Sequence, residues 1–384
     1  MNRKTKEIVL IIIATLASTI CLWLPFFSNQ AKFLGFPIPS GGMKTIFANY
    51  DGPNYIIIAK TWYETSLIAS LFSLPLPLEY YPAHFPAYPF LIRIIGFLLP
   101  FTQAMISATV LTSVAAALIF YLFLNHFKLS QNPFWLTLIF LFLPARFFIV
   151  RSVGAPESLF IFAILASFYF FKEKKYWLAA LFGSLAQVTK TPAILLFAAY
   201  IIYLFYQTHQ EGNRSVRQII SQVLPRALPL FLIPLSALGV FGFYLYRTGD
   251  FWAYFHSGDN FHLTPFPFQS FNSNRNWLGD IWNEDMVWLY LLSAIGVILL
   301  FKRKLIDLSI FAAVFYLATV FVAHRDLSRY SLPFFPFLLI GFDPLLQRKE
   351  FKIAFLIILP AIYLYALNFI IGNRAPVADW RPYL

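Results

Sequence analysis

Charged side chains are rare in this chain, and one of them stands beside two residues that favour the start of a helix. Asp51 lies in the stretch NYDGPNYIIIAKTWY (residues 49–63), directly before Gly52 and Pro53. Proline suits the first position of a helix, so Asp51 or Gly52 is expected to cap a helix over residues 53–66. Asp51 is interpreted either as a helix cap alone or as a general base at a membrane surface.

The apolar pattern of that segment predicts a helix lying in the plane of the membrane, on its outer surface. Tyr55, Ile58, Ala59 and Trp62 recur at helical spacing and would share one face. The opposite face would carry the polar residues Asn54, Thr61 and Thr65. Such a helix would hold Asp51 at its N-terminal end.

His84 is the next candidate, in EYYPAHFPAYPFLIR (residues 79–93), where prolines favour a stiff, extended backbone. Its imidazole either binds a substrate or belongs to the belt of polar aromatic rings at a membrane interface. Residues 87–100 are too short to cross a bilayer, and we expect them to lie along the interface or to pair with the next helix.

A third stretch, ARFFIVRSVGAPESLF (residues 145–160), places Arg146, Arg151 and Glu157 around a short turn. Glu157 follows Pro156 at an expected helix start, where the helix dipole favours a carboxylate. An Arg151–Glu157 ion pair is the structural interpretation. Inserting an ionisable side chain at membrane depth costs roughly 2.5–3.5 kcal/mol, so such residues are usually kept for a function. The functional interpretation is that these residues bind a substrate.

Lys190 lies in a tight turn of QVTKTPAILL (residues 187–196), with Thr191 as the expected cap and Pro192 opening the next helix. A cation beside a free helix N-terminus forms a corner that attracts anions. The alternative is a lysine whose ammonium reaches the lipid headgroups.

The fifth stretch, AHRDLSRYSLPFFPFL (residues 323–338), gathers charge in a short loop between two apolar runs. Its candidate substrate-binding residues are Arg325, Asp326, Arg329 and Tyr330, beside His324. Two arginines within a helical turn could clamp a phosphate group. The sequence contains no Walker loop, no HExxH and no Cys/His spacing typical of a metal site.

The composition places these residues in a membrane protein. Hydrophobic residues make up 59% of the chain and charged residues 12%, and the mean hydropathy is +0.68. The net charge of +12 comes from clusters between apolar runs, a pattern that suits anionic lipids and topology signals better than nucleic acid. The single cysteine, Cys21, excludes an internal disulfide.

We predict one all-α membrane domain over residues 1–384. Eleven apolar runs could cross the membrane, at about 8–27, 102–124, 134–150, 156–171, 176–190, 191–207, 227–246, 285–301, 305–322, 331–346 and 353–371. Basic clusters then fall on the side of the N-terminus, which predicts a cytoplasmic N-terminus and a retained anchor over residues 1–27. Two long outer loops, 28–86 and 247–284, would face the other side.

Four stretches occur in the order typical of one superfamily: NYDGPNYIIIAKTWY, YYPAHFPAYPFLIR, RSVGAPESLFIFAILASFYFF and YWLAALFGSLAQVTKTPAILL. The chain resembles the GT-C polytopic glycosyltransferases, in particular the branch that contains the second mannosyltransferase of GPI-anchor synthesis and its prokaryotic relatives. The resemblance covers about residues 45–200, and beyond them it is carried by Arg329, Tyr330 and Pro333.

This resemblance implies roles for individual residues. Asp51 matches the catalytic aspartate of the first outer loop, and Glu157 matches the acid of an ESL motif. Other matching positions are Tyr55, Ala59, Tyr63, Pro82, Phe85, Pro86 and Pro89. The chain departs from the usual Trp, Gly and Arg of the branch at Tyr50, Trp62 and Lys190.

The resemblance implies a polyprenyl-phosphate sugar as donor. We predict transfer of its sugar, with mannose as the expected one, to a lipid- or glycan-linked acceptor outside the cytoplasm, by a single displacement with inversion. Asp51 would accept the proton of the acceptor hydroxyl, and Arg325, Arg329 and Lys190 would neutralise the departing lipid phosphate. No cofactor is required, although Asp51 and Glu157 could share a divalent metal ion. The enzyme would reside in a plasma membrane, or in the endoplasmic reticulum of a eukaryote.

Two alternatives remain open from the sequence. A transporter or a flippase for lipid-linked glycans would also need ionisable residues within a membrane bundle. Charged candidates on one face of the membrane and the lack of a repeated half favour an enzyme. Within the enzymes, the transferred sugar could be arabinose or a hexosamine.

Overall fold

The chain is almost entirely helical, as the sequence predicts. The computed structural model describes residues 2–28, 30–73, 76–212, 215–258, 262–272 and 284–384. In these residues the only strands are β1 (Lys32–Phe33) and β2 (Phe36–Pro37), which pair antiparallel in a short hairpin. The all-α class is thereby confirmed.

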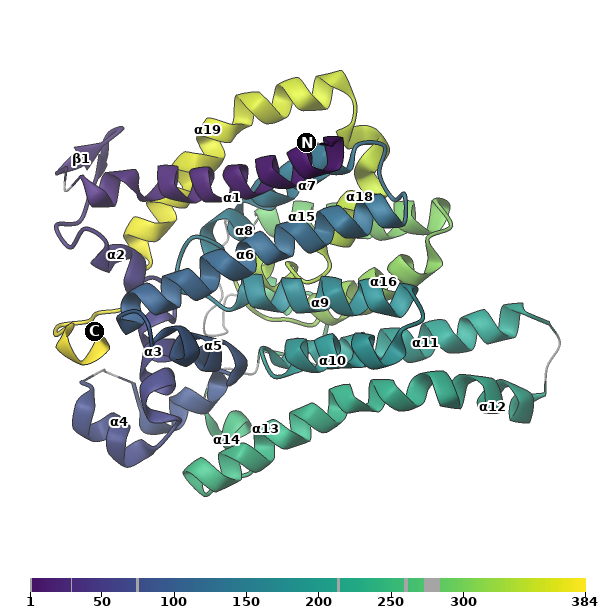
Figure 1. Cartoon of the computed structure of the whole chain (residues 1–384), viewed down its shortest axis with the longest axis horizontal. Helices are drawn as coiled ribbons and strands as arrows, with labels where there is room; N and C mark the ends of the chain where they lie inside the picture. Colours follow the sequence, from purple (N-terminus) through teal and green to yellow (C-terminus); the bar gives the residue numbers. More distant parts are fainter. Residues whose placement is uncertain (1, 29, 74–75, 213–214, 259–261, 273–283) are drawn as a thin grey trace.

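Six helical segments in the described residues are long and apolar enough to cross a membrane (Figure 1). They are α1 (Arg3–Phe27), α6 (Phe101–His126), η2 with α11 (Thr191–Ala193 and Ile194–Gln210), α12 to α13 through η3 (Val216–Ala227, Leu228–Phe231 and Leu232–Thr248), α15 (Glu284–Lys302) and α19 (Lys349–Gly372). Shorter apolar helices are α7 (Pro133–Phe142), α16 (Ile306–Val320) and α18 (Phe335–Leu346). The protein is a multi-pass helical membrane protein, and the predicted eleven spans are not confirmed.

One broken run and two short helices explain why the structure has fewer long apolar helices than the eleven predicted spans. The run 134–150 divides into α7 and α8 (Ala145–Val150), because Pro144 has no N–H with which to continue the helix. The runs 156–171 and 176–190 become α9 (Glu157–Lys172) and α10 (Tyr176–Gln187), which pack against each other. Each of these helices is shorter than the ~20 residues that a perpendicular crossing needs.

The predicted surface helix over 53–66 is wrong in its length and in its burial. Helix α3 (Gly52–Thr61) ends where Trp62 adopts a positive φ of 51°, and α4 (Thr65–Leu71) begins separately. Both expected polar-face residues of α3 are buried, with Asn54 at 6% and Thr61 at 1% exposure. Three consecutive isoleucines leave α3 without a polar side, so α5 (Ala87–Ile95) and α6 pack against it.

The remaining short elements surround this end of the bundle. They are α2 (Lys44–Phe47), η1 (Leu78–Ala83), α14 (Ala253–His256), η4 (Gln269–Phe271), α17 (Leu327–Tyr330) and η5 (Arg381–Tyr383). Helix α5 packs on α6, which agrees with the expected pairing of residues 87–100 with the next helix. In the predicted outer loop 247–284, residues 259–261 and 273–283 lie outside the described residues.

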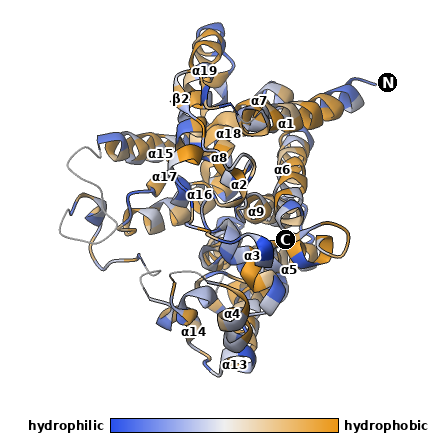
Figure 2. Cartoon of the chain, turned by 90° about the vertical axis from the view of Figure 1, so that its left-hand side faces the viewer, coloured by the Kyte–Doolittle hydropathy of each residue, from blue (hydrophilic) through white to orange (hydrophobic). Residues whose placement is uncertain are grey.

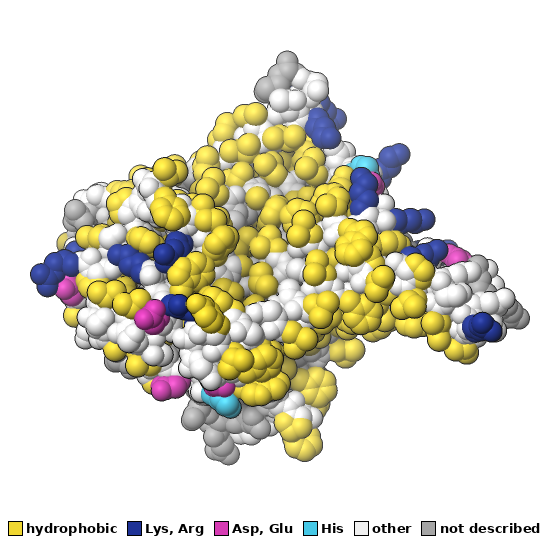
Figure 3. Space-filling model, turned by 60° about the horizontal axis from the view of Figure 1, so that its bottom comes forward, with side chains coloured by type: hydrophobic (Ala, Val, Ile, Leu, Met, Phe, Trp, Pro, Cys, Tyr) yellow, Lys and Arg dark blue, Asp and Glu magenta, His cyan; other side chains and the backbone are white. Residues whose placement is uncertain are grey.

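The long helices run roughly side by side, so the bundle has two distinct ends (Figure 1). The N-terminus, the end of α11 and the start of α12 lie toward one end, whereas α2, α3 and the C-terminus lie at the other. On the face drawn in Figure 3, hydrophobic side chains cover most of the middle and Lys and Arg gather nearer the edges. This distribution suits a bundle whose middle is surrounded by lipid.

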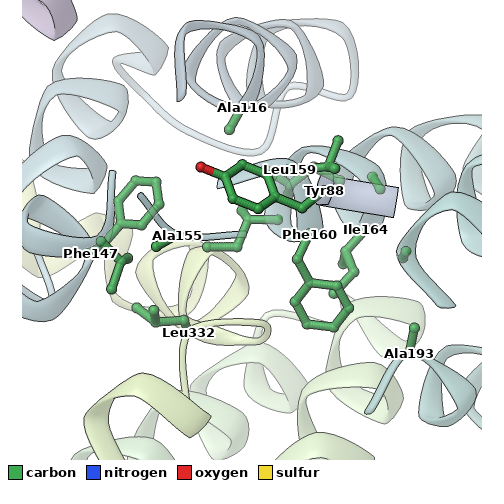
Figure 4. Close-up of a cluster of buried hydrophobic side chains, with 14 of the residues drawn as sticks. Tyr88, Ala116, Phe147, Ala155, Leu159, Phe160, Ile164, Ala193 and Leu332 are labelled. Atoms are coloured by element: carbon green, nitrogen blue, oxygen red, sulfur yellow. The ribbon is translucent and has the colours of Figure 1, made fainter. Parts of the chain in front are cut away.

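A cluster of buried apolar side chains joins several of these elements (Figure 4). It includes Tyr88 from α5, Phe147 from α8, Phe160 from α9 and Leu332 beyond α17, each at most 2% exposed. Close packing of this kind fixes side chains to well-defined positions. The cluster thus holds rigid the elements that supply the charged residues described next.

Candidate active site

A cavity of about 170 Å³ lies where segments from distant parts of the chain meet. Most of the predicted site residues line it: Asp51, Tyr55, His84, Glu157, Lys190, Arg329 and Tyr330. They come from α3, from the residue after η1, from the start of α9, from the turn before η2 and from α17. The structure therefore brings together candidates that the sequence offered from five separate stretches.

Asp51 occupies the N-cap position of α3 without acting as a side-chain cap. Its carboxylate forms no hydrogen bond to the first turn of the helix. About 30% of the Asp51 side-chain surface is accessible, and the residue lines the cavity. The interpretation of Asp51 as only a helix cap is therefore not supported, and the carboxylate is available for chemistry.

The backbone before Asp51 is tied to the segment that follows α19. The Ala375 N–H donates to the carbonyl of Ala48 at 2.7 Å, and the Tyr50 N–H donates to that of Asn373 at 3.4 Å. The buried amide of Asn49 donates to the carbonyl of Ile370 at 2.8 Å. These bonds hold the turn in which Tyr50 adopts a φ of +50° and directs the chain into α3.

Two glycines allow the turns at Asp51 and Glu157 to approach α6. A Cβ atom on Gly154 would lie 2.3 Å from the sulfur of Met105, and one on Gly52 would lie 2.7 Å from the carbonyl oxygen of Phe47. A side chain at position 52 would collide with backbone, so this position requires glycine, whereas one at position 154 would displace the side chain of Met105. The sulfur of Met105 thus packs closely beneath both turns.

Basic side chains surround the carboxylate of Asp51. Its Oδ2 lies 3.7 Å from Nε2 of His84 and 3.9 Å from Nη2 of Arg329, distances too long for hydrogen bonds but short enough for strong electrostatic contact. Burial alone would raise the pKa of Asp51, but His84, Arg329 and Lys190 together lower it to about 2. The carboxylate is therefore ionised at neutral pH.

Glu157, the first residue of α9, holds two cations on one oxygen. Its side chain is only 2% exposed, and Oε1 accepts from Nζ of Lys190 at 2.8 Å and from Nε of Arg329 at 2.6 Å. Its other oxygen, Oε2, has no hydrogen-bond partner in the described residues. Burial lowers the pKa of Arg329, but Glu157, Tyr50 and Asp51 raise it well above its ordinary value. Arg329 is thus permanently charged.

Arg329 is also held from its other side by an aromatic ring. Its guanidinium lies 4.5 Å from the ring centre of Tyr50, a cation–π arrangement. The hydroxyl of Tyr50 accepts from Nη1 of Arg146 at 3.2 Å, and Nε of Arg146 pairs with Asp326 at 2.9 Å. Asp326 therefore holds Arg146, which in turn contacts Tyr50, and Asp326 does not itself line the cavity. Arg325 is exposed and does not line it either.

The predicted role of Arg151 is not supported, and neither is the proposed Arg151–Glu157 pair. Arg151 is fully buried away from the cavity, with its guanidinium against α1. It donates to the carbonyls of Leu141 and Thr15 and to the hydroxyls of Ser18 and Thr19, at 2.8–3.3 Å. These neutral acceptors occupy all three guanidinium nitrogens, so Arg151 connects α1 with the region around α8 and takes no part in the cavity wall.

His84 is fixed within a group of aromatic rings. Its ring meets that of Tyr55 edge to face at 5.0 Å, and its carbonyl accepts from the hydroxyl of Tyr63 at 2.6 Å. Its Nδ1 is buried and has no partner in the described part of the chain. The position beside Asp51 favours the substrate-binding interpretation of His84 over that of an interfacial belt residue.

Several residues of the cavity wall were not predicted from the sequence: Tyr80, Thr191, Tyr254 and His262. Tyr254 lies within 3.2 Å of the Thr191 hydroxyl, oxygen to oxygen. The carbonyl of His262 accepts from the N–H of Ala323, which ties the second outer segment to the loop before α17. The many aromatic residues of 251–271 were the sequence feature that could have pointed to Tyr254 and His262. That feature does not indicate which ring faces the cavity.

The cavity combines paired charges with polar aromatic rings. Asp51 and Glu157 are its two carboxylates, and no cluster of three or more His, Cys, Asp or Glu side chains suited to a metal ion occurs among the described residues. Rings with polar edges, from Tyr55, Tyr80, Tyr254 and Tyr330, suit a ligand with both apolar and hydroxyl-bearing faces. No family model matches the chain, and no curated protein matches its sequence.

Proposed function

We propose that the protein is a glycosyltransferase that moves a sugar from a polyprenyl-phosphate donor to a lipid- or glycan-linked acceptor. The observation that carries this proposal is the Asp51 carboxylate, free of its helix-capping role, facing a cavity beside Arg329 and the Glu157–Lys190 pair. The motif resemblance to the GT-C glycosyltransferases supports it independently. We take mannose as the first sugar to test.

The proposed reaction is a single displacement with inversion at the anomeric carbon. The acceptor oxygen forms a bond to that carbon, while the bond from the carbon to the phosphate oxygen breaks on the opposite face. The proton of the acceptor hydroxyl passes to Asp51. A carboxylate with a pKa of about 2 is a weak base, but the hydroxyl becomes strongly acidic as its oxygen bonds to carbon, so the transfer is favourable late in the step.

The leaving phosphate would be stabilised by Arg329 and Lys190. Both cations already face the cavity, and Glu157 holds them in place through Oε1. Preorganised charge of this kind needs no rearrangement when negative charge develops on the departing group, which is why it contributes strongly to catalysis. The unpartnered Oε2 of Glu157 could accept from a sugar hydroxyl.

The membrane setting supports a lipid-linked donor. The cavity belongs to a multi-pass helical bundle, at the end that carries α3 and the C-terminus. The cavity wall also has partly exposed apolar members, including Ala83 and Pro192, that could lie along the first units of a lipid chain. We place this end outside the cytoplasm, following the distribution of basic residues around the predicted spans.

Incubation of purified protein with radiolabelled polyprenyl-phosphate mannose and a panel of acceptors tests the proposal. We expect a labelled product without any nucleotide sugar, and loss of that product in Asp51→Asn. Product from UDP- or GDP-sugars only would point to another type of glycosyltransferase. Vectorial movement of intact lipid-linked sugar in vesicles, with no transfer in detergent, would instead favour a flippase.

A further inference from the structure

A second hollow lies outside the candidate active site, between residues 41–48 and the C-terminal segment 372–380. It encloses about 560 Å³, and we call it the C-terminal hollow. Its wall includes Ala48 and Ala375, whose backbones form the hydrogen bond that also secures the turn before Asp51. Figures 1 and 2 both place α2 near the C-terminus at this end of the bundle.

Two cations from opposite ends of the sequence meet at this hollow. Lys44 and Arg374 both line it, both are exposed, and neither forms an ion pair with a carboxylate of the described residues. The charge of Lys44 reaches Asp379, but the oxygens of Asp379 already accept from Nε and Nη2 of Arg381 at 2.8–3.1 Å. Among the described residues, Lys44 and Arg374 therefore give the hollow a net positive charge without a carboxylate in direct contact with either of them.

Thr45 adds a buried polar atom without a partner. Its side chain is only 3% exposed, it lines the hollow, and its Oγ1 forms no hydrogen bond in the described part of the chain. Buried hydroxyl groups nearly always have a partner, because leaving one unpaired costs free energy. A ligand oxygen in the hollow would give the Thr45 hydroxyl the hydrogen-bond partner that the described residues do not provide.

An aromatic ring completes the wall. Trp380 lines the hollow and is held edge-on by Phe47, with ring centres 6.2 Å apart, and at a tilt by Tyr383, at 5.6 Å. An indole ring offers an apolar face to the part of a ligand that lies next to a charged group. Trp380, Lys44 and Arg374 together form a site suited to an anionic group that is part of a larger molecule.

We propose that the C-terminal hollow binds a phosphate group through Lys44 and Arg374, with the Thr45 hydroxyl as a further partner and Trp380 against the body that bears the phosphate. A guanidinium can grip two phosphate oxygens at once, and the lysine adds a point charge. The phosphate could belong to a lipid headgroup or be free in solution. This inference is independent of sugar transfer, because the hollow is separate from the catalytic cavity.

A local probe can test binding at this hollow. Because the chain has a single cysteine, Cys21→Ser followed by Ala378→Cys gives one labelling position in the wall of the hollow. A fluorophore sensitive to its environment is attached there, and the detergent-solubilised protein is titrated with dioctanoyl phosphatidic acid, with inorganic phosphate and with dioctanoylglycerol, which lacks phosphate.

The Lys44→Gln/Arg374→Gln double variant should weaken saturable binding at least tenfold, whereas Lys302→Gln/Lys304→Gln, which removes two exposed lysines from the other end, should not change it. Saturation by phosphatidic acid alone assigns a lipid headgroup, and saturation by inorganic phosphate as well assigns phosphate from either source. Equal responses to dioctanoylglycerol, no saturable response, or unchanged affinity in the first double variant with an unchanged melting temperature would overturn the proposal. Since the readout is binding and not transfer, either proposal can fail without the other.

Discussion

Arg151 and Arg329 both carry a guanidinium into the interior of the same bundle, but their surroundings differ. Arg151 is fully buried and donates to neutral carbonyl and hydroxyl oxygens through Nε, Nη1 and Nη2. Arg329 keeps 19% of its side chain exposed, and it contacts the carboxylates of Glu157 and Asp51 at the wall of a cavity.

The difference shows that a buried charge is not by itself a sign of function. A guanidinium whose nitrogens are all occupied by fixed neutral acceptors has nothing left for a ligand, and its removal affects the packing of helices. A guanidinium that shares an incomplete set of charged partners beside a cavity can exchange one of them for a phosphate oxygen. Each prediction below tests one side of this contrast.

The largest effect is expected at the carboxylate that faces Arg329. Asp51→Asn keeps the shape of the side chain and removes the base, so the rate of sugar transfer should fall about a thousandfold, within the range typical of general-base loss. The measurement is turnover with the radiolabelled lipid-linked donor at neutral pH. Asp250→Asn, which alters a carboxylate paired with His256 away from the cavity, should retain the wild-type rate. Wild-type transfer by Asp51→Asn would remove Asp51 as the base.

Arg329→Gln should reduce kcat/KM about a hundredfold, because a preorganised charge at the departing phosphate is lost. Arg329→Lys retains the charge without the planar fork and should recover part of that loss. The melting temperature in detergent is measured alongside. If both variants lose stability but transfer normally per folded molecule, Arg329 is a structural residue and the contrast with Arg151 is wrong.

Arg151→Met should have the opposite signature. The loss of four charge-assisted hydrogen bonds, offset by relief of the buried charge, should lower the free energy of unfolding by about 2–4 kcal/mol. Transfer by the molecules that remain folded should stay within about threefold of wild type. The assay is denaturation in detergent, followed by kinetics normalised to folded protein. A hundredfold loss of transfer with unchanged stability would mean that Arg151 acts in the active site after all.

Much of this site was accessible from residue types and local order. Asp51, Glu157, Lys190 and Arg329 stand out because a chain with 12% charged residues rarely places ionisable groups beside apolar runs without a role. Their convergence was an inference about the fold, and the cavity bears it out. The sequence also predicted helices throughout, because long apolar runs leave the backbone no other way to satisfy its hydrogen bonds in lipid.

The errors have physical causes that a single sequence does not reveal. Arg151 and Arg329 look alike in sequence, and only the fold, which brings the residue after α8 next to α1, decides that Arg151 meets Ser18 and Thr19. The burial of α3, including Asn54 and Thr61, depends on the packing of other elements such as α5 and α6 against it. The break in the predicted span 134–150 is the exception, because Pro144 is visible in the sequence and its missing N–H ends α7 there.

The smallest effect is expected in the acid limb of the pH profile. Because the folded-state pKa of Asp51 is about 2, below its ordinary value near 4, transfer should stay level from neutral pH down to about pH 4. The same shift means that the ionised carboxylate contributes stability above about pH 4 and loses this contribution as the pH falls toward 2. Initial rates over pH 3–8 give the profile, with the melting temperature measured at each pH.

The two arginines should separate in this profile as well. Arg329 is one of the charges that lower the pKa of Asp51, so Arg329→Gln should move the acid limb of its residual activity to higher pH. Arg151 is not among these charges, and Arg151→Met should leave the limb where it is in wild type. An unmoved limb in Arg329→Gln, or an equal displacement in Arg151→Met, would mean that proximity to the Asp51 carboxylate does not distinguish the two guanidinium groups.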